Sequence, residues 1–214
     1  MRGTELQDRV QRAVGRAAMA VGDWCEAFRP VGAGPALDPV NRFMLLKASF
    51  SLPHEGYAGT AAYGSAAWVG MFDAGYTSPG DYLVRPDAAV WFVASQPPLM
   101  PVLCVRTNRV VGVSRPAELR PLGVNGYGGV GHALEQVLDR WPASVLTVRG
   151  VGMRGVELPS DVAAGSWQVL LPASCTAVLR HDDVLTDDLG RTGVVAAAEL
   201  SELGWRLLVR QATV

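Results

Sequence analysis

From residue 68 onward the chain alternates short apolar runs with turn residues, and this pattern limits its fold more than any other feature. The runs 68–72, 90–94 and 205–209 are rich in Trp, Val and Leu, and Gly, Pro or Asp separates such runs from one another. The 214-residue chain holds 24 Gly and 14 Pro, a content that suits many turns better than long helices. The pattern predicts a mainly β protein with small antiparallel barrel-like units.

The two β regions of the chain resemble each other. The matches share one offset and pair 81–83 with 183–185, 92–94 with 194–196, and 103–105 with 205–207. Each region also begins with a Trp-led run, at Trp68 and at Trp167. Repeats of this length are typical of tandem copies of one unit, although two unrelated small barrels would share similar alternation. The predicted fold class is therefore mainly β, with an N-terminal helix before two small antiparallel barrel-like units, and tandem duplication is one explanation of their likeness.

Turn residues and changes of pattern divide the chain into five parts. These are an N-terminal helix over 1–28, an irregular docking-loop region over 29–65, a first β-barrel unit over 66–116, a linker with a short helix over 117–142, and a second β-barrel unit over 143–214. The short helix is expected within 131–141, where apolar residues recur at helical spacing before Pro142.

The first part carries an apolar stripe at helical spacing. The stripe consists of Leu6, Val10, Val14, Ala17 and Val21, and it predicts a helix that ends near Gly22. Because the stripe is narrow and rich in Ala, it is weak for a core helix. We expect it to pack on a partner surface or on another copy of the chain.

The charge balance disfavours non-specific nucleic-acid binding. Nineteen basic residues face twenty acidic ones, whereas proteins that neutralise phosphates carry a basic excess. Arg9, Arg12 and Arg16 could face nucleic acid in a pore, but a solvated helix face is the preferred interpretation. Apolar runs remain well below the roughly 18 residues needed to cross a bilayer. The N-terminal 22 residues do not resemble a signal peptide.

Residues that could carry chemistry are scattered. Three cysteines, Cys25, Cys104 and Cys175, are far apart and lack metal-ligand spacing, so reduced thiols in a cytosolic setting are expected. The histidines are His54, His132 and His181. A literal GxGxxG at 126–131 lacks the preceding strand and the acidic ribose ligand of a dinucleotide site. We predict no catalytic residue, no cofactor and no metal, and interpret His181-Asp182-Asp183 as a turn.

One loop is a candidate docking surface. Residues 56–65 lack large aliphatic side chains, and Tyr57 and Tyr63 have little to pack against locally. Aromatic side chains on exposed loops are typical anchors for partner surfaces. We therefore expect Tyr57 and Tyr63 to dock a partner.

Both β regions resemble structural proteins of tailed bacteriophages and prophages. The likeness lies in 80–84, 90–94 and 103–116 in the first region, and in 183–185 and the Gly204-Trp205-Arg206-Leu207 run in the second. It is closest to the small β-barrel head–tail joining proteins, also called stopper or head-completion proteins. Members of that family are usually about half this length, so two units with a helix are a departure.

The resemblance implies a virion structural protein rather than an enzyme. Its expected place is the head–tail neck, as a homo-oligomeric ring between portal or adaptor and tail tube or terminator, through which DNA would pass without specific binding. The particle would assemble in the host cytoplasm, with no membrane partner. A tail or baseplate protein of the same particle is the alternative. Other classes left open are a hydrolase that uses Cys175 or Cys104 with a histidine, and a small soluble binding module.

Overall fold

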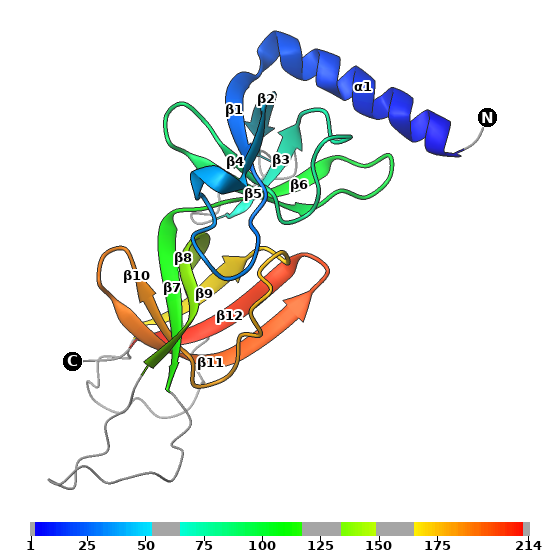
Figure 1. Cartoon of the computed structure of the whole chain (residues 1–214). Coiled ribbons are helices and arrows are strands. Elements are labelled where there is room, and N and C mark those ends of the chain that lie inside the picture. Colours follow the sequence, from blue (N-terminus) through cyan, green and yellow to red (C-terminus); the bar gives the residue numbers. More distant parts are fainter. Residues whose placement is uncertain (1–2, 53–64, 117–133, 149–164, 212–214) are drawn as a thin grey trace, which may run out of the picture.

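The structure is a computed structural model, and it describes residues 3–52, 65–116, 134–148 and 165–211. Within these ranges one α-helix, α1 (Gly3–Val21), precedes two closed antiparallel barrels (Figure 1). The first barrel contains β1 (Asp23–Phe28), β2 (Arg42–Ser51), β3 (Ala67–Met71), β4 (Tyr82–Val84), β5 (Val90–Ser95) and β6 (Val102–Arg106). The second contains β7 (Arg109–Pro116), β8 (Leu134–Val148), β9 (Ser166–Leu171), β10 (Val184–Asp187), β11 (Thr192–Ser201) and β12 (Gly204–Gln211). The predicted fold class is confirmed.

Alternation along the strands explains why the barrels close around apolar interiors. In β12, Trp205, Leu207 and Val209 are buried, whereas the residues between them are exposed. Successive side chains of a strand point to opposite faces, so every second residue enters the interior. The wall of a closed barrel has no unpaired edge strand, and its interior is filled by these side chains.

The two barrels have the same strand order. The first closes as β1-β2-β3-β6-β5-β4 and the second as β10-β11-β12-β9-β8-β7, which is that order in reverse with six added to each number. The register also agrees. In the first barrel Val93 pairs with Cys104, which pairs with Trp68. In the second, Val195 pairs with Val209, which pairs with Trp167, so the two Trp-led runs are equivalent.

One predicted match is out of register. Cys104 corresponds to Val209, so the predicted match of 103–105 with 205–207 is wrong by three residues. Strands β5 and β11 carry a bulge at the equivalent place, between Val93 and Ser95 and between Val195 and Ala197. Beyond it the second hairpin extends further, and the extra residues shift β12 relative to β6.

The predicted short helix within 131–141 is wrong where the structure describes it, because residues from 134 belong to strand β8. A bulge explains the helical spacing. Val111 pairs with Trp141 and Val113 with Leu138, so three residues of β8 advance opposite two residues of β7. Arg140 inside this bulge has a φ of 49°. Leu138 and Trp141 therefore both point inward at a spacing that resembles a helix turn.

The predicted boundaries of both barrel units also differ from the strand assignment. The first barrel begins in the residues assigned to the helix and the docking-loop region, since β1 and β2 belong to it. β7, placed in the first unit 66–116, is the first strand of the second barrel, and β8 begins in the linker rather than at 143. β2 was obscured because its outward side chains include Phe43 and Leu45, which hide the apolar–polar alternation.

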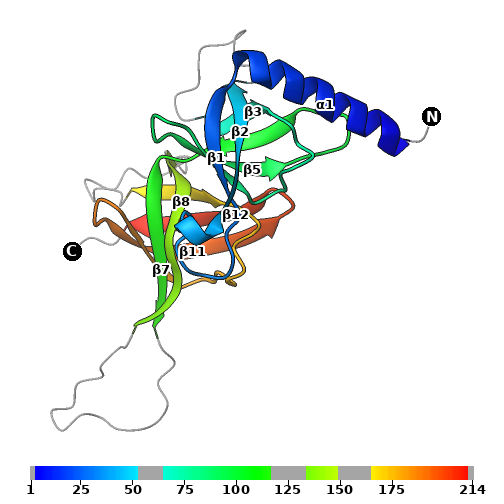
Figure 2. The ribbon, with the colours of Figure 1, turned by 45° about the horizontal axis from the view of Figure 1, so that its top comes forward.

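The barrels pack closely on each other, and α1 lies at the far end of the first (Figure 1; Figure 2). Tyr82 Oη donates to the carbonyl of Pro142 at 2.7 Å, and Trp141 Nε1 donates to the carbonyl of Gly34 at 2.7 Å. The Tyr82 and Trp141 rings meet edge to face at 6.1 Å. The β1–β2 loop of the first barrel thus lies over the interior of the second.

Candidate functional site

The N-terminal helix leaves much of its apolar stripe uncovered. Gly15 and Ala18 are its buried positions, and a Cβ added at Gly15 would lie 2.8 Å from the Cβ of Asp73. Small residues therefore allow the helix to approach the barrel. The predicted stripe is turned away from this contact, since Leu6 is 40% and Val21 is 67% exposed.

One uncovered surface lies where α1 meets the β5–β6 connection. A cavity of about 330 Å³ opens there, and no charged side chain among the described residues lines it. Its polar lining comes from the amides of Gln7, Gln11 and Gln96. We define the groove face as the exposed apolar residues at and beside this cavity, Leu6, Val10, Leu99 and Met100.

A second uncovered surface lies on the other side of the helix. We define the tryptophan face as Met19, Trp24, Leu45 and Tyr76, which are all exposed around a hollow of about 490 Å³. The hollow is also lined by three basic side chains, Arg12, Arg16 and Lys47, and by one acidic side chain, Asp73. The ammonium of Lys47 lies 5.7 Å from the Trp24 ring centroid and donates to the carbonyl of Met19 at 3.0 Å.

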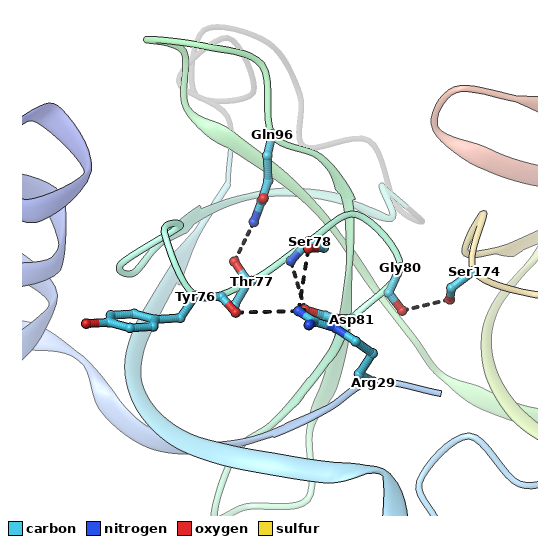
Figure 3. Close-up of polar contacts among 8 residues, drawn as sticks. All are labelled: Arg29, Tyr76, Thr77, Ser78, Gly80, Asp81, Gln96 and Ser174. Carbon is cyan, nitrogen blue, oxygen red and sulfur yellow. Dashed lines mark hydrogen bonds and ion pairs between the residues drawn. The ribbon is translucent and has the colours of Figure 1, made fainter. Parts of the chain in front are cut away.

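A polar cluster braces the first barrel at the turn before β4 (Figure 3). Asp81 is buried, and Arg29 donates to its carboxylate from Nε at 2.8 Å and from an Nη at 2.7 Å. The backbone N–H of Ser78 donates to the same carboxylate at 2.8 Å. On the far side of the turn, Ser174 donates to the carbonyl of Gly80 at 2.9 Å and so ties the second barrel to the first.

The second barrel contains the same cluster. Asp183 is buried, and Arg115 donates to its two oxygens at 2.7 and 2.9 Å. The backbone N–H of Arg180 donates to it at 2.7 Å. The two arginines also occupy equivalent positions. Arg29 follows Phe28, which pairs with Tyr82 of β4, and Arg115 follows Ser114, which pairs with Val184 of β10.

These clusters are structural ties rather than reactive groups. The hydrogen bond from each arginine to its aspartate raises the pKa of Arg29 and of Arg115. In each pair a charged arginine makes two hydrogen bonds to a buried carboxylate. Such bidentate pairs hold the turn in one conformation relative to the neighbouring strand. Sequence analysis matched Asp81 with Asp183 but missed both arginines. Arg29 directly follows β1, which was not predicted as a strand, and Arg115 belongs to β7, which was assigned to the first barrel unit.

The cysteines are all buried, which opposes their use as nucleophiles. Burial raises the pKa of Cys25 to about 11, that of Cys104 to about 12 and that of Cys175 to about 11. A thiol must ionise to attack a carbonyl, so these environments favour the unreactive form. Their positions give the hydrolase alternative no support.

The residues of the predicted turn at 181–183 have different surroundings. His181 Nδ1 and Asp182 form an exposed pair at 2.8 Å, whereas Asp183 is turned inward to Arg115. Among the described residues, no group of three or more His, Cys, Asp or Glu side chains is arranged to hold a metal ion. Arg9, Arg12 and Arg16 are exposed on α1.

Several predicted features lie outside the described residues. These are the docking residues Tyr57 and Tyr63, the glycine motif 126–131, His54 and His132. The two faces beside α1 are therefore the strongest candidate interaction surface in the described part of the chain. The sequence signal for them was the thin apolar stripe, while Trp24, Leu45 and Tyr76 were missed.

Comparison with protein-family models, with curated proteins and with solved structures finds no match to this chain. Helix α1 is not apolar enough over its length to cross a membrane, and it is the one α-helix of the described residues.

Proposed function

We propose that the chain is a virion structural protein of a tailed bacteriophage, and that it forms part of a head–tail neck ring between portal and tail. The observation that carries the proposal is the uncovered apolar surface on both sides of α1, set on a braced body of two barrels. Contiguous exposed apolar patches mark interaction sites. The resemblance of both β regions to head–tail joining proteins supplies the kind of particle.

The rigidity of the body supports an assembly role. Each barrel is closed, each carries a buried Arg–Asp tie, and the barrels share side-chain hydrogen bonds and an apolar contact. A joint that transmits load between head and tail needs a body that does not deform when neighbours bind.

The test is genetic and microscopic. In the phage or prophage that encodes the chain, genes for portal, capsid and tail tube should flank its own. Deletion should leave DNA-filled heads without attached tails, and an epitope-tagged copy should label the neck in electron micrographs. Complete, infectious particles from the deletion strain would contradict the proposal. Label on the tail tip would place the protein in the baseplate instead.

A further inference from the structure

The two faces beside α1 differ in charge and lie on opposite sides of the helix. Val10 and Val14 line the groove, whereas Arg12, Gly15 and Met19 line the other hollow. At about 100° per residue along a helix, these sets lie on either side of the line that contacts the barrel. One partner that covers the groove face thus leaves the tryptophan face exposed.

We infer that copies of this chain associate head to tail, with the groove face of one copy on the tryptophan face of the next. Because the two faces lie on opposite sides of α1, a symmetric dimer built on either face leaves the other face uncovered. A head-to-tail contact covers both, and its repetition generates a ring or a filament. The inference rests on the proposed function in one respect, the closure of that repeat into a neck ring.

Charge favours this pairing over a symmetric one. Asp73 offsets one of the three cations of this hollow, so two tryptophan faces brought together would still set a basic excess from Arg12, Arg16 and Lys47 against the same excess in the other copy. The groove cavity has no charged lining side chain, and its amides can accept hydrogen bonds from the arginines. Trp, Tyr and Arg are also the residues that most often anchor interfaces, and all three belong to this side.

The exposed apolar residues supply a large part of the area that a specific contact needs. The eight apolar residues of the two faces are between 37% and 65% exposed. A fully buried aromatic side chain such as that of Trp24 or Tyr76 contributes roughly 150–250 Å² and the six aliphatic ones somewhat less, so the exposed parts together supply at most about 800 Å² when one face covers the other. Specific interfaces bury about 1,200–2,000 Å² in total. Exposed alanines of α1 and the arginine stems can supply the remainder.

The test is complementation between two variants of the full chain. Leu6→Glu/Met100→Glu disables the groove face, and Trp24→Thr/Leu45→Thr disables the tryptophan face. Sedimentation velocity from about 1 μM to 1 mM covers the range of weak to moderate affinity. The wild-type chain should gain mass with concentration, and each variant alone should remain monomeric. An equimolar mixture should form a dimer that contains one copy of each variant, because each variant retains one intact face.

Three outcomes would overturn the inference. These are a wild-type chain that stays monomeric throughout, a single-face variant that still dimerises by itself, and a mixture that does not associate. Leu189→Glu, an exposed position in the β10–β11 turn, is the matched control and should behave like wild type. Unchanged circular dichroism and melting temperature show that the variants fold, and Val10→Gln and Tyr76→Ser provide milder alternatives. Failure here leaves the particle experiments unaffected, so it is distinguishable from failure of the proposed function.

Discussion

The two barrels share a backbone plan but place their large side chains differently. Cys25 pairs with Leu46 in the first barrel, and at the equivalent place Val111 pairs with Trp141 in the second. Trp91 is buried in β5, whereas the equivalent residue of β11 is Gly193. The indole ring at these positions therefore belongs to β5 in the first barrel and to β8, the equivalent of β2, in the second. These strands lie on opposite walls of the barrel.

The difference shows which features specify this barrel. Interiors need the right total volume, which many combinations of side chains can supply. Bulges, turns and the Arg–Asp ties recur at equivalent positions, so they set the register. The strand plan therefore depends more on these polar and backbone features than on any one core residue.

The surroundings differ as well. The second barrel receives the β1–β2 loop of the first, and Ala36 of that loop joins its apolar interior. The first barrel carries α1, whose two flanks remain exposed. If the chain assembles as proposed, apolar surface of the second barrel is buried by contacts within the chain, and apolar surface of the first barrel is buried by contacts between chains.

The largest effect should come from Trp141→Ala. Trp141 is fully buried, and its indole joins the second barrel to Gly34 of the first. Loss of its volume and hydrogen bond should lower the free energy of unfolding by about 3–5 kcal/mol. Calorimetry should also resolve separate transitions for the barrels. Leu189→Ala, at an exposed site away from both faces of α1, is the control and should cost less than about 1 kcal/mol; a similar small loss for Trp141→Ala would contradict the described interior.

Removal of either buried carboxylate should give matching losses. Asp81→Ala and Asp183→Ala each remove two arginine hydrogen bonds and one backbone hydrogen bond. Each should lower the free energy of unfolding in urea by about 2–4 kcal/mol, and the two losses should agree within about 1 kcal/mol. The control is Asp188→Ala, whose pair with Arg109 is exposed and long at 3.9 Å. Very unequal losses would show that the ties are not equivalent.

The stability of the turn after β10 should depend on acidic pH, whereas that of the equivalent turn after β4 should not. Burial raises the pKa of the Asp187 carboxyl, but hydrogen bonds from Arg191 and from the backbone N–H groups of Arg191 and Leu189 outweigh it and hold the pKa below its usual 3.8. The first barrel has Arg85 at this position, with the same backbone hydrogen bond across the turn.

The sign of the pH effect follows from that lowered pKa. The stability that Asp187 contributes is complete above its unfolded pKa and is lost as the pH falls through the lower folded value, so the window lies below about pH 4. The difference in unfolding free energy between wild type and Asp187→Asn should therefore be larger at pH 7 than at pH 3. A difference that does not change with pH would contradict the assignment.

Sequence patterns predicted the fold class and part of the repeat, and particular residues explain the rest. The matched Asp81 and Asp183 and the two Trp-led runs were visible because turn residues and aromatic residues mark equivalent positions. β8 was missed because a bulge gives a strand the spacing of a helix. The tryptophan face was missed because Trp24 and Leu45 face outward, and a sequence does not state which face of a strand meets solvent.

The smallest expected effect is an exchange at equivalent turn residues. Ala88 has a φ of 62° and Gly190 a φ of 74°, and each donates its backbone N–H across the turn at 3.0 Å, to Arg85 and to Asp187. A left-handed conformation costs a residue with a Cβ roughly 1–2 kcal/mol, whereas glycine loses about 0.4–1 kcal/mol more chain entropy on folding. The backbone term is the larger, so Ala88→Gly should stabilise the chain by about 0.5 kcal/mol. Gly190→Ala should destabilise it by a similar amount, although space is available, since nothing lies within 4 Å of an added Cβ.

Urea midpoints at constant slope measure both, and the double variant should return close to wild type because the sites are independent. Shifts of the same sign for the two single variants would show that the turns are not equivalent in energy, even though their hydrogen bonds coincide.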